Sequence, residues 1–486
     1  MVEKGFFSTM ITELFIEVPL YHLLLEVSLF VWVIYLIFRR SGPSESEMKR
    51  LGMKLRDSEK EQLLSDWNPE PLIDHSTTSN PPPIERVVEG KVGKRITVNG
   101  QSCLNFATQN YIGLIGNEAI ENSAIETITK CGVGSCGPRG FYGTHEIHLD
   151  LEERLAKFMD LEEALVYSYG FSTISSAIPA YAKRGDIIFV DEGVNFAVQM
   201  GLEASRSDIE YFKHNDVKDL EKLLDQQAER DRRNPKKAAK TRRFLIVEGI
   251  YMKFGDICPL PELIELRKKH KLRIFIDESV SFGTLGKHGR GVTEYFNIPK
   301  IEVDLIMVSM ENALASVGGF CVGSSYIIEH QRLSGLGYCF SASLPPLLAS
   351  AAISAIDRLE SDPSILDDLR EKCHHLQKVI SENQKISQLF TLMAHPDSPV
   401  KHLQLKNSSN LSLEKQLAIL DNISNFSINN GFAIVPASYL YEKEKYKPTP
   451  SIRLAVNVQM TEEETNKLCS VLEQACSDYY IHDKKS

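Results

Sequence analysis

The sequence predicts a two-lobed α/β protein whose larger lobe is built on a mostly parallel sheet. Its 486 residues are 43% hydrophobic and 25% charged, which is globular composition with more length than one small domain needs. From about residue 95, short apolar runs alternate with amphipathic stretches, a pattern typical of strands separated by helices. After about residue 350 a long helical pattern leads to a strand-like SIRLAVNV, which indicates a second, smaller α/β lobe.

The strands of the larger lobe are predicted from its short apolar runs. These runs are Ala164–Tyr169, Ile187–Val190, Phe244–Val247, Ile274–Ile276, Leu305–Val308 and Phe320–Val322. We predict a large domain over 101–350 and a small domain over 351–486, preceded by an anchor segment over 1–60 and a lead-in over 61–100 that contains Pro81–Pro83. Thr461 and Glu464 have the spacing of a capping box, so a helix is expected to start there.

The N-terminal stretch Pro19–Phe38, PLYHLLLEVSLFVWVIYLIF, is different in kind. As a helix it is about 30 Å long, enough to cross a bilayer core. The run is long and no small-x-small cleavage site follows, so we predict a retained transmembrane helix rather than a signal peptide. A cluster of cations follows the stretch: Arg39, Arg40, Lys49, Arg50, Lys54 and Arg56. Because positively charged residues flank membrane helices on the cytosolic side, we expect the bulk of the chain to lie in the cytosol. Glu26 inside the stretch faces either a partner helix or the membrane interface.

Charge and cysteine usage exclude several function classes. A net charge of −10 argues against a general nucleic-acid binder, and no zinc-finger or Walker A motif occurs. The nine cysteines are odd in number and form no C-x-x-C, so we expect reduced thiols rather than a disulfide or metal framework. The basic run 231–243 is either a solvated loop or a contact for anionic lipid headgroups.

Two stretches carry the chemistry. IFIDESVSFGTLGKHGRG runs from a buried strand into Asp277 and a Gly-rich loop, and ligands of open α/β sheets sit beyond the carboxyl ends of strands. A carboxylate there can hold a ring nitrogen protonated, although Asp277 alone could equally cap a strand end. The second stretch is MVSMENALASVGGFCVG, a strand, a polar loop with Asn312, and a Gly-Gly pair.

Four further stretches complete a recognisable set: NYIGL, VGSCGPRGFYGTHEIHLDLE, YSYGFSTISS and YCFSASLPPL. In this order the set resembles the α-oxoamine synthases, which are fold-type-I pyridoxal-phosphate enzymes. The resemblance runs from about Asn105 to the C-terminus. It implies the fold-type-I large domain and the condensation of an amino acid with an acyl-CoA, with release of carbon dioxide.

Position by position, the resemblance places Asp277 where the family pairs with the pyridine nitrogen. Val280 and Asn195 stand where the family has histidines that orient and stack on the cofactor. Asn312 stands where the family has its Schiff-base lysine, six residues before Gly318. A carboxamide nitrogen is delocalised and cannot form the imine. We therefore expect a vestigial cofactor site at Asp277 and Asn312, with no covalently bound cofactor. Lys253 and Lys287 are other lysines of the lobe, but their local sequence does not favour either as a substitute.

Within this family the chain is most similar to one of two related chains of a membrane-bound heteromer, the one that lacks the lysine. The resemblance implies a lysine-bearing partner that holds pyridoxal phosphate, a small activating subunit, Orm-type regulators, and residence in the endoplasmic reticulum membrane. The chain would be a required but non-catalytic subunit. The alternative is a pure scaffold or regulatory protein with no part in any active site.

Two loops are predicted to contribute to the partner's active site. Cys136, Arg139 and Tyr142 lie in the Gly-rich loop, where backbone can approach a ligand closely. Ser341 and Ser343 match a turn that reaches the neighbouring phosphate in the family. Burial or packing within this chain is the competing interpretation for Cys136 and Tyr142.

Overall fold

The computed structural model describes residues 20–39, 57–67, 72, 86–406, 408–441 and 443–483. The chain divides into two compact units, Met1–Glu85 and Arg86–Ser486. The predicted linker at Pro81–Pro83 and the basic residues from Arg40 to Arg56 lie outside the described residues.

The first unit contains two described helices, α2 (Leu20–Arg39) and α4 (Asp57–Asp66). Helix α2 coincides with the apolar stretch, and its side chains Phe30 and Phe38 are exposed. Across the described part of the chain, however, no helix combines the length and apolar character needed to cross a membrane. The helix was predicted correctly, whereas its crossing of a membrane is not confirmed.

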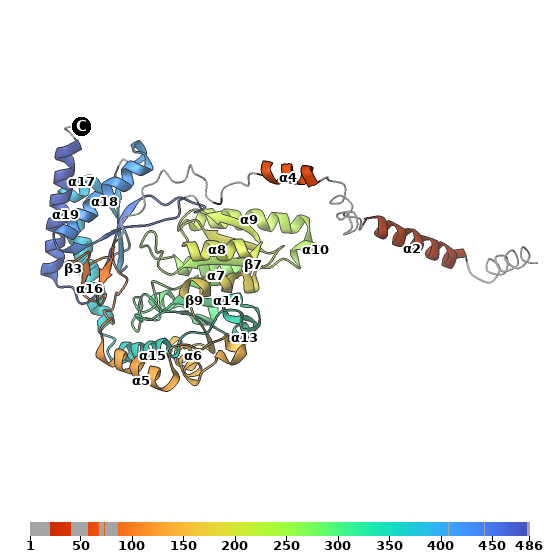
Figure 1. Cartoon of the computed structure of the whole chain (residues 1–486), viewed down its shortest axis with the longest axis horizontal. Helices are drawn as coiled ribbons and strands as arrows, with labels where there is room; N and C mark the ends of the chain where they lie inside the picture. The colour runs from red at the N-terminus through yellow and green to blue at the C-terminus, as the bar shows by residue number, and fades with distance from the viewer. Residues whose placement is uncertain are drawn as a thin grey trace, which may run out of the picture. The chain divides into compact units, whose positions relative to one another are not determined.

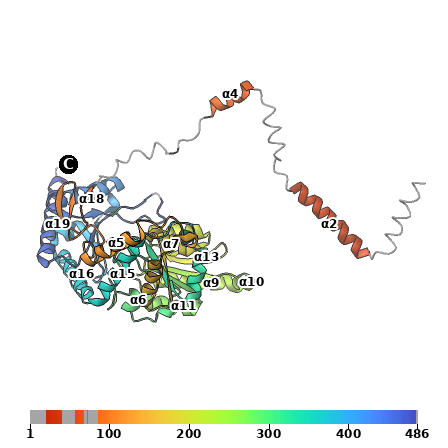
Figure 2. The same ribbon diagram turned by 60° about the horizontal axis from the view of Figure 1, so that its bottom comes forward.

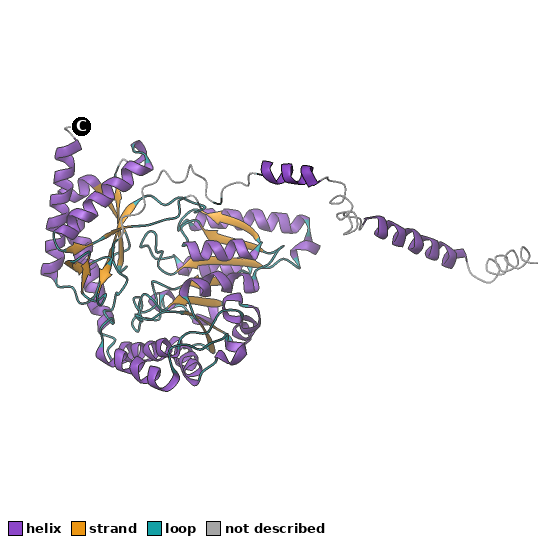
Figure 3. Cartoon of the chain, in the orientation of Figure 1, coloured by secondary structure: helices purple, strands orange, loops and turns teal. Residues whose placement is uncertain are grey.

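The second unit is organised around a seven-stranded sheet with the order β4-β10-β9-β8-β7-β5-β6 (Figures 1 and 3). Its strands are β4 (Glu163–Tyr167), β5 (Ile187–Asp191), β6 (Asp208–Phe212), β7 (Arg243–Glu248), β8 (Arg273–Asp277), β9 (Leu305–Ser309) and β10 (Gly319–Gly323). Strand β10 runs antiparallel to both of its neighbours, β4 and β9, whereas the pairs from β9 to β6 are all parallel. Strands β5, β9 and β10 are buried along their whole length, as expected for a sheet covered on both faces.

Helices cover this sheet and fill the connections between strands. They are α5 (Glu118–Cys131), η2 (Arg139–Gly143), α6 (Glu146–Met159), α7 (Gly170–Tyr181), α8 (Phe196–Ser205), α9 (Val217–Arg233), α10 (Pro235–Ala238), α11 (Leu260–His270), α12 (Val292–Tyr295), η3 (Lys300–Glu302), α13 (Ser325–Ser334), α14 (Leu336–Cys339) and α15 (Pro346–Ser361). Helix α15 packs against both α5 and α6 in one layer of the lobe (Figures 1 and 2).

The smaller lobe carries two four-stranded sheets and the C-terminal helices. The strands are β1 (Val88–Glu89), β2 (Arg95–Val98), β3 (Gln101–Asn105) and β13 (Phe432–Ala433) in one sheet, and β11 (Phe390–Met393), β12 (Val400–Leu405), β15 (Ser451–Ala455) and β14 (Val435–Pro436) in the other. The helices are α16 (Ile365–Glu382), α17 (Gln384–Leu389), η4 (Ser408–Asn410), α18 (Leu413–Asn429) and α19 (Glu462–Asp483). The predicted capping box is confirmed, because Thr461 N donates to Glu464 at 2.8 Å and Glu464 N to Thr461 at 3.2 Å.

A buried ion pair joins the two lobes. Glu444, in the connection between β14 and β15, accepts from Lys253 Nζ at 2.6 Å and from Gln199 Nε2 at 2.7 Å. All three side chains are buried. Lys253 is thus committed to a carboxylate, while the other alternative lysine, Lys287, is exposed. All nine cysteines are free thiols, as predicted.

Candidate functional site

The carboxyl ends of β7 and β8 bring two buried acids together at the centre of the large sheet. Glu248 ends β7, Asp277 ends β8, and the two are direct neighbours in the parallel register. Sequence reasoning found Asp277 and missed Glu248. A Glu that closes an apolar run, as in RFLIVE, was the available signal. This is the edge where ligands of such sheets bind.

Both oxygens of Asp277 are engaged by this chain. Oδ2 accepts from Asn195 Nδ2 at 2.6 Å, and Oδ1 accepts from Ser279 N at 2.9 Å. Asp277 is 1% exposed. Burial raises the pKa of Asp277 above its ordinary range, because a carboxylate loses its hydration there.

Asn195 is the N-cap of α8 and connects the two acids. Its Oδ1 accepts from Val198 N at 3.1 Å, which is the ordinary capping bond. Its amide nitrogen donates to Asp277, and its backbone N–H donates to Glu248 at 2.5 Å. Asn195, which the resemblance places at the position of a ring-stacking histidine, therefore lies directly against Asp277, which the resemblance assigns to the ring nitrogen.

Glu248 and Asp277 share a site with little compensating charge. Glu248 is 2% exposed, and its second oxygen accepts from Met252 N at 3.1 Å. Burial, followed by the charge of Asp277, raises the pKa of Glu248 to about 8. Lys253, whose charge acts on Glu248 in the opposite direction, is already paired with Glu444.

Glu278 is a third buried acid, also missed by sequence reasoning. Its carboxylate accepts from Val292 N at 3.0 Å and from the Ser281 hydroxyl, and burial raises the pKa of Glu278 to about 7. Gly291 has φ +87°, and a Cβ at this position would lie 2.3 Å from Glu278 Oε2. The Gly-rich loop after β8 thus closes over an acid, and only glycine allows this approach.

Asn312 lies in the loop between β9 and β10 and is 4% exposed. Its Nδ2 donates to the backbone oxygen of Ser279 at 2.6 Å, so the amide ties this loop to the one after β8. Val280 is buried in the apolar core, 2% exposed. Gly318 has φ +115°, and a Cβ would lie 2.9 Å from Tyr167 O, which explains the Gly-Gly pair.

The hydrogen bonds of these residues bear on whether pyridoxal phosphate fits them. Oδ2 of Asp277, the acid that the resemblance places against a pyridine nitrogen, already accepts from Asn195. Asn312, which the resemblance places at the imine position, offers an amide and not an amine. Val280 offers no polar atom. These residues do not fit a covalently held cofactor.

The predicted interface loops lie against each other. Ser343 N donates to Gly137 O at 3.0 Å, and the Ser343 hydroxyl donates to Gly143 O at 2.5 Å. Ser343 is buried, so its hydroxyl is used within this chain. Ser341, two residues earlier, is half-buried.

Within the Gly-rich loop the predicted residues separate into one buried and two exposed. Arg139 is buried and makes a bidentate pair with Glu152, at 2.8 and 3.0 Å, below the ring of Tyr338. Cys136 and Tyr142 are exposed and have positive φ values of 57° and 62°. The buried ion pair therefore holds a strained turn that presents Tyr142 outward.

Large apolar side chains are exposed on the Gly-rich loop and on or next to α14, which contacts η2. We call this set the exposed apolar patch, and all its members are more than half exposed: Val133, Phe141, Tyr142, Leu336 and Phe340. Large aromatic and aliphatic side chains gathered in this way mark interaction surfaces.

The fold defines an α/β pyridoxal-phosphate-transferase scaffold, with Asp277, Asn195 and Asn312 in its candidate site. Residues 101–472 match the family model "Aminotransferase class I and II". The chain belongs to this family, and the predicted α/β pyridoxal-phosphate-transferase fold is confirmed.

Within this family, the chain is similar to proteins named for long chain base biosynthesis and serine palmitoyltransferase. The chain is 41% identical to long chain base biosynthesis protein 1b of Oryza sativa subsp. japonica, over 94% of this chain and 92% of that protein. It is 39% identical to serine palmitoyltransferase 1 of Dictyostelium discoideum, over 92% of each chain. Serine palmitoyltransferase 1 of Saccharomyces cerevisiae is 31% identical, over 94% of this chain and 88% of that one.

Solved structures agree on the fold. A serine palmitoyltransferase from S. paucimobilis superposes with a TM-score of 0.73 at 23% identity, covering 87% of this chain and 97% of that one. The Sphingomonas wittichii enzyme gives 0.71 at 25% identity with the same coverage.

Proposed function

We propose that this chain is a non-catalytic subunit of a serine palmitoyltransferase. The complex would condense L-serine with palmitoyl-CoA to 3-ketosphinganine, the entry step of sphingolipid synthesis. A related, lysine-bearing chain, serine palmitoyltransferase subunit 2, would hold pyridoxal phosphate, and this chain would complete its active site at the shared interface.

The observation that carries the proposal is the bond from Asn312 Nδ2 to Ser279 O, 2.6 Å long, at the position where the family needs an amine. An amide with its nitrogen committed to a backbone carbonyl is not a nucleophile. Relatives named as serine palmitoyltransferase 1 and long chain base biosynthesis protein 1 supply the substrate class.

The contact face proposed for the partner is the exposed apolar patch on the two paired loops. Exposed Phe340 and Tyr142 flank a loop whose backbone is pinned by Ser343 and Arg139. A rigid loop with outward aromatic side chains suits a permanent interface. Cys136 on the same loop is the exposed group proposed to lie nearest the partner's substrate.

Co-purification with a lysine-bearing homologue is the most direct test. We expect each chain alone to be inactive with serine and palmitoyl-CoA and the pair to be active. Turnover by this chain alone would overturn the proposal. As a second arm, the isolated chain is mixed with pyridoxal phosphate and reduced with borohydride. We expect no cofactor fixed to any of its lysines, Lys253 and Lys287 included.

A bulky substitution at Cys136 distinguishes two roles of this chain. In one it contributes to the partner's active site, and in the other it is only a scaffold or regulatory protein. Cys136→Trp should leave the complex assembled and lower its turnover, with loosened choice between serine and smaller amino acids, because the loop lies at the shared site. Cys136→Ser is the size-matched control and should be nearly neutral. Normal turnover and selectivity in the Trp variant would favour a scaffold or regulatory role.

Residence at the endoplasmic reticulum membrane, a small activating subunit and Orm-family regulators are also part of the proposal. Support for the membrane comes from the exposed apolar side chains of α2, such as Phe30 and Phe38. Carbonate extraction of membranes, before and after deletion of α2, tests this part independently of the activity assay.

A further inference from the structure

The corner formed by α9 and α10 carries a surplus of positive charge in a protein that is acidic overall. Eight of the 14 residues from Arg230 to Arg243 are Lys or Arg, while the whole chain has a net charge of −10. The segment is a helix–turn–helix rather than a loose loop. Asn234 ends α9, and its side chain accepts from Lys237 N at 3.2 Å to begin α10.

Four arginines of the corner are paired and hold it together. Arg230 pairs with Glu210 on β6 at 2.9 Å, Arg242 with Asp186 at 2.7 Å, Arg243 with Asp231 at 2.5 Å and Arg233 with Glu229 at 4.0 Å. These pairs tie the corner to the sheet and to itself, which fixes where the remaining cations stand.

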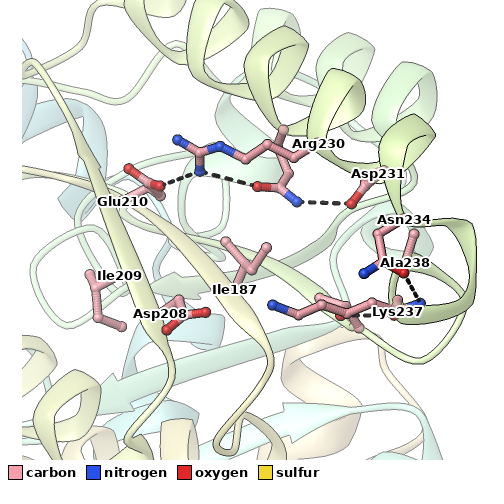
Figure 4. A pocket seen from close by; sticks show the side chains of 11 residues that line it. Ile187, Asp208, Ile209, Glu210, Arg230, Asp231, Asn234, Lys237 and Ala238 are labelled. Atoms are coloured by element: carbon pink, nitrogen blue, oxygen red, sulfur yellow. Dashed lines mark hydrogen bonds and ion pairs between the residues drawn. The ribbon is translucent and has the colours of Figure 1, made fainter.

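A cleft of about 540 Å³ lies beside the corner, between β6 and the two helices (Figure 4). Its charges are balanced internally. Arg230 meets Glu210 and Gln227, Asp231 accepts from Gln227, and Lys237 extends along the cleft that Asp208 also lines. The cleft itself is therefore not the anion site.

Four cations of the corner remain without a carboxylate partner. They are exposed, and none forms an ion pair with any residue that the structure describes: Arg232, Lys236, Lys237 and Lys240. Lys237 lines the cleft, whereas the other three do not. They stand at the helix end and the turn that project from the lobe, where α10 lies at its margin (Figure 2). No aromatic residue lies between Arg230 and Arg243, so base stacking as used by single-strand nucleic-acid binders has no platform.

We infer that this corner docks on an anionic phospholipid surface. A projecting, rigid group of long cationic side chains matches a layer of lipid phosphates, which is flat and needs no pocket. Clusters of four to eight Lys and Arg typically bind such surfaces, with attraction that is screened by salt. The inference does not depend on Asn312 or on the proposed catalytic partnership.

The test is flotation of the full chain with vesicles of phosphatidylcholine alone or mixed with phosphatidylserine. The variant is Arg232→Glu/Lys236→Glu/Lys240→Glu. The matched control is Lys157→Glu/Lys378→Glu/Lys415→Glu, which reverses three exposed lysines on α6, α16 and α18. Helix α2 is present in every protein, so its own lipid binding cancels in the comparison.

We expect the corner variant to lose at least about tenfold of its affinity for the phosphatidylserine vesicles, since each cation near the surface contributes several-fold. The control should bind like the wild type, and raised salt should remove the difference. Equal binding of all three proteins would overturn the inference. So would a corner-dependent preference for an RNA oligonucleotide or an acidic peptide over the vesicles. Failure of this test leaves activity with the lysine-bearing partner as a separate question.

Discussion

The amide nitrogen of Asn195 lies 2.6 Å from Oδ2 of Asp277, so the acid that would face a cofactor ring is already hydrogen-bonded within the chain. The same Asn195 caps α8 and donates through its backbone to Glu248. The candidate site is therefore a set of hydrogen-bonded polar groups around two buried acids, Asp277 and Glu248.

Restoring the lysine alone should not restore the cofactor site. In Asn312→Lys we expect no cofactor fixed by borohydride, because Asn195 still occupies Asp277 and Val280 adds no polar contact. The substitution buries an ammonium and removes the bond to Ser279 O, which should cost about 2–4 kcal/mol of unfolding free energy. Asn312→Ala is the control for the lost bond alone. Efficient fixation in the single variant would contradict this account of the site.

The buried pair of Arg139 and Glu152 should behave as a unit. Arg139→Met removes both hydrogen bonds of the bidentate pair and leaves the buried Glu152 carboxylate with Arg332, at 3.7 Å, as its remaining cation. We expect a loss of about 3 kcal/mol in urea unfolding. Arg139→Met/Glu152→Leu should recover part of that loss, although Val166 N also loses its acceptor. Losses that simply add in the double variant would show that the pair is not coupled.

Glycine at position 291 is required by contact as well as by backbone angle. Gly291→Ala would place a methyl group 2.3 Å from Glu278, so we expect a loss of about 3 kcal/mol or more. Gly185 is the matched control, since its φ is +94° and nothing lies within 4 Å of its Cβ position. Gly185→Ala should cost only about 1–2 kcal/mol. Thermal unfolding of both variants separates the cost of the backbone angle from the cost of the contact with Glu278. Equal losses of stability would mean that the contact is unimportant.

Deprotonation of His214 should lower the free energy of unfolding at alkaline pH. Burial alone would lower its pKa, but hydrogen bonds and charges from Asp191 (3.0 Å) and Asp256 (3.5 Å) outweigh burial and raise the pKa to about 9. A raised pKa favours the folded state while the ring is protonated. The contribution is thus complete below about pH 6.5 and disappears as pH rises through about 9, for a total of up to about 3 kcal/mol.

Urea unfolding of the wild type and His214→Gln across that pH window measures the effect. We expect the difference between the two proteins to shrink as pH rises, because the variant has no proton to lose there. A difference that stays constant would rule out a protonated His214 in the folded state.

Exposed aromatic residues of the patch should matter for assembly and not for folding. Tyr142→Ala/Phe340→Ala removes two fully or largely exposed side chains, so unfolding free energy should change by less than about 0.5 kcal/mol per residue. Affinity for the lysine-bearing homologue should fall at least about tenfold, as expected for aromatic residues central to an interface. Ile301→Ala, 74% exposed on η3, is the control. An unchanged affinity would move the contact face elsewhere.

Most of the sheet was predictable from the sequence because its strands are continuous apolar runs. Strand β6 was missed, since DIEYF at the sheet edge is half-exposed and carries two acids among its five residues. The site residues Asp277, Asn195 and Asn312 were found through the family resemblance. The hydrogen bonds from Asn195 to Asp277 and from Asn312 to Ser279 were not predicted. In both, the partner lies far along the chain, and local sequence does not indicate it.

Arg139 shows the limit most clearly. An arginine in a Gly-rich loop is typical of a ligand contact. Nothing in the local sequence indicates that Arg139 is buried and paired with Glu152. Ser343 likewise looks available for a phosphate, whereas its hydroxyl is used by Gly143, 200 positions earlier. Glu248 and Glu278 were overlooked because an acid at a strand end usually caps it, and burial is what makes these two unusual.

The Lys253–Glu444 pair that joins the lobes has a consequence for association. Opening the lobes would expose or orphan two buried charges, so hinge motion between them is energetically costly. If the chain forms the proposed complex, the fixed arrangement of its lobes leaves little conformational entropy to lose on binding. The chain is in this sense preorganised, because the arrangement of its two lobes is fixed before any binding partner arrives.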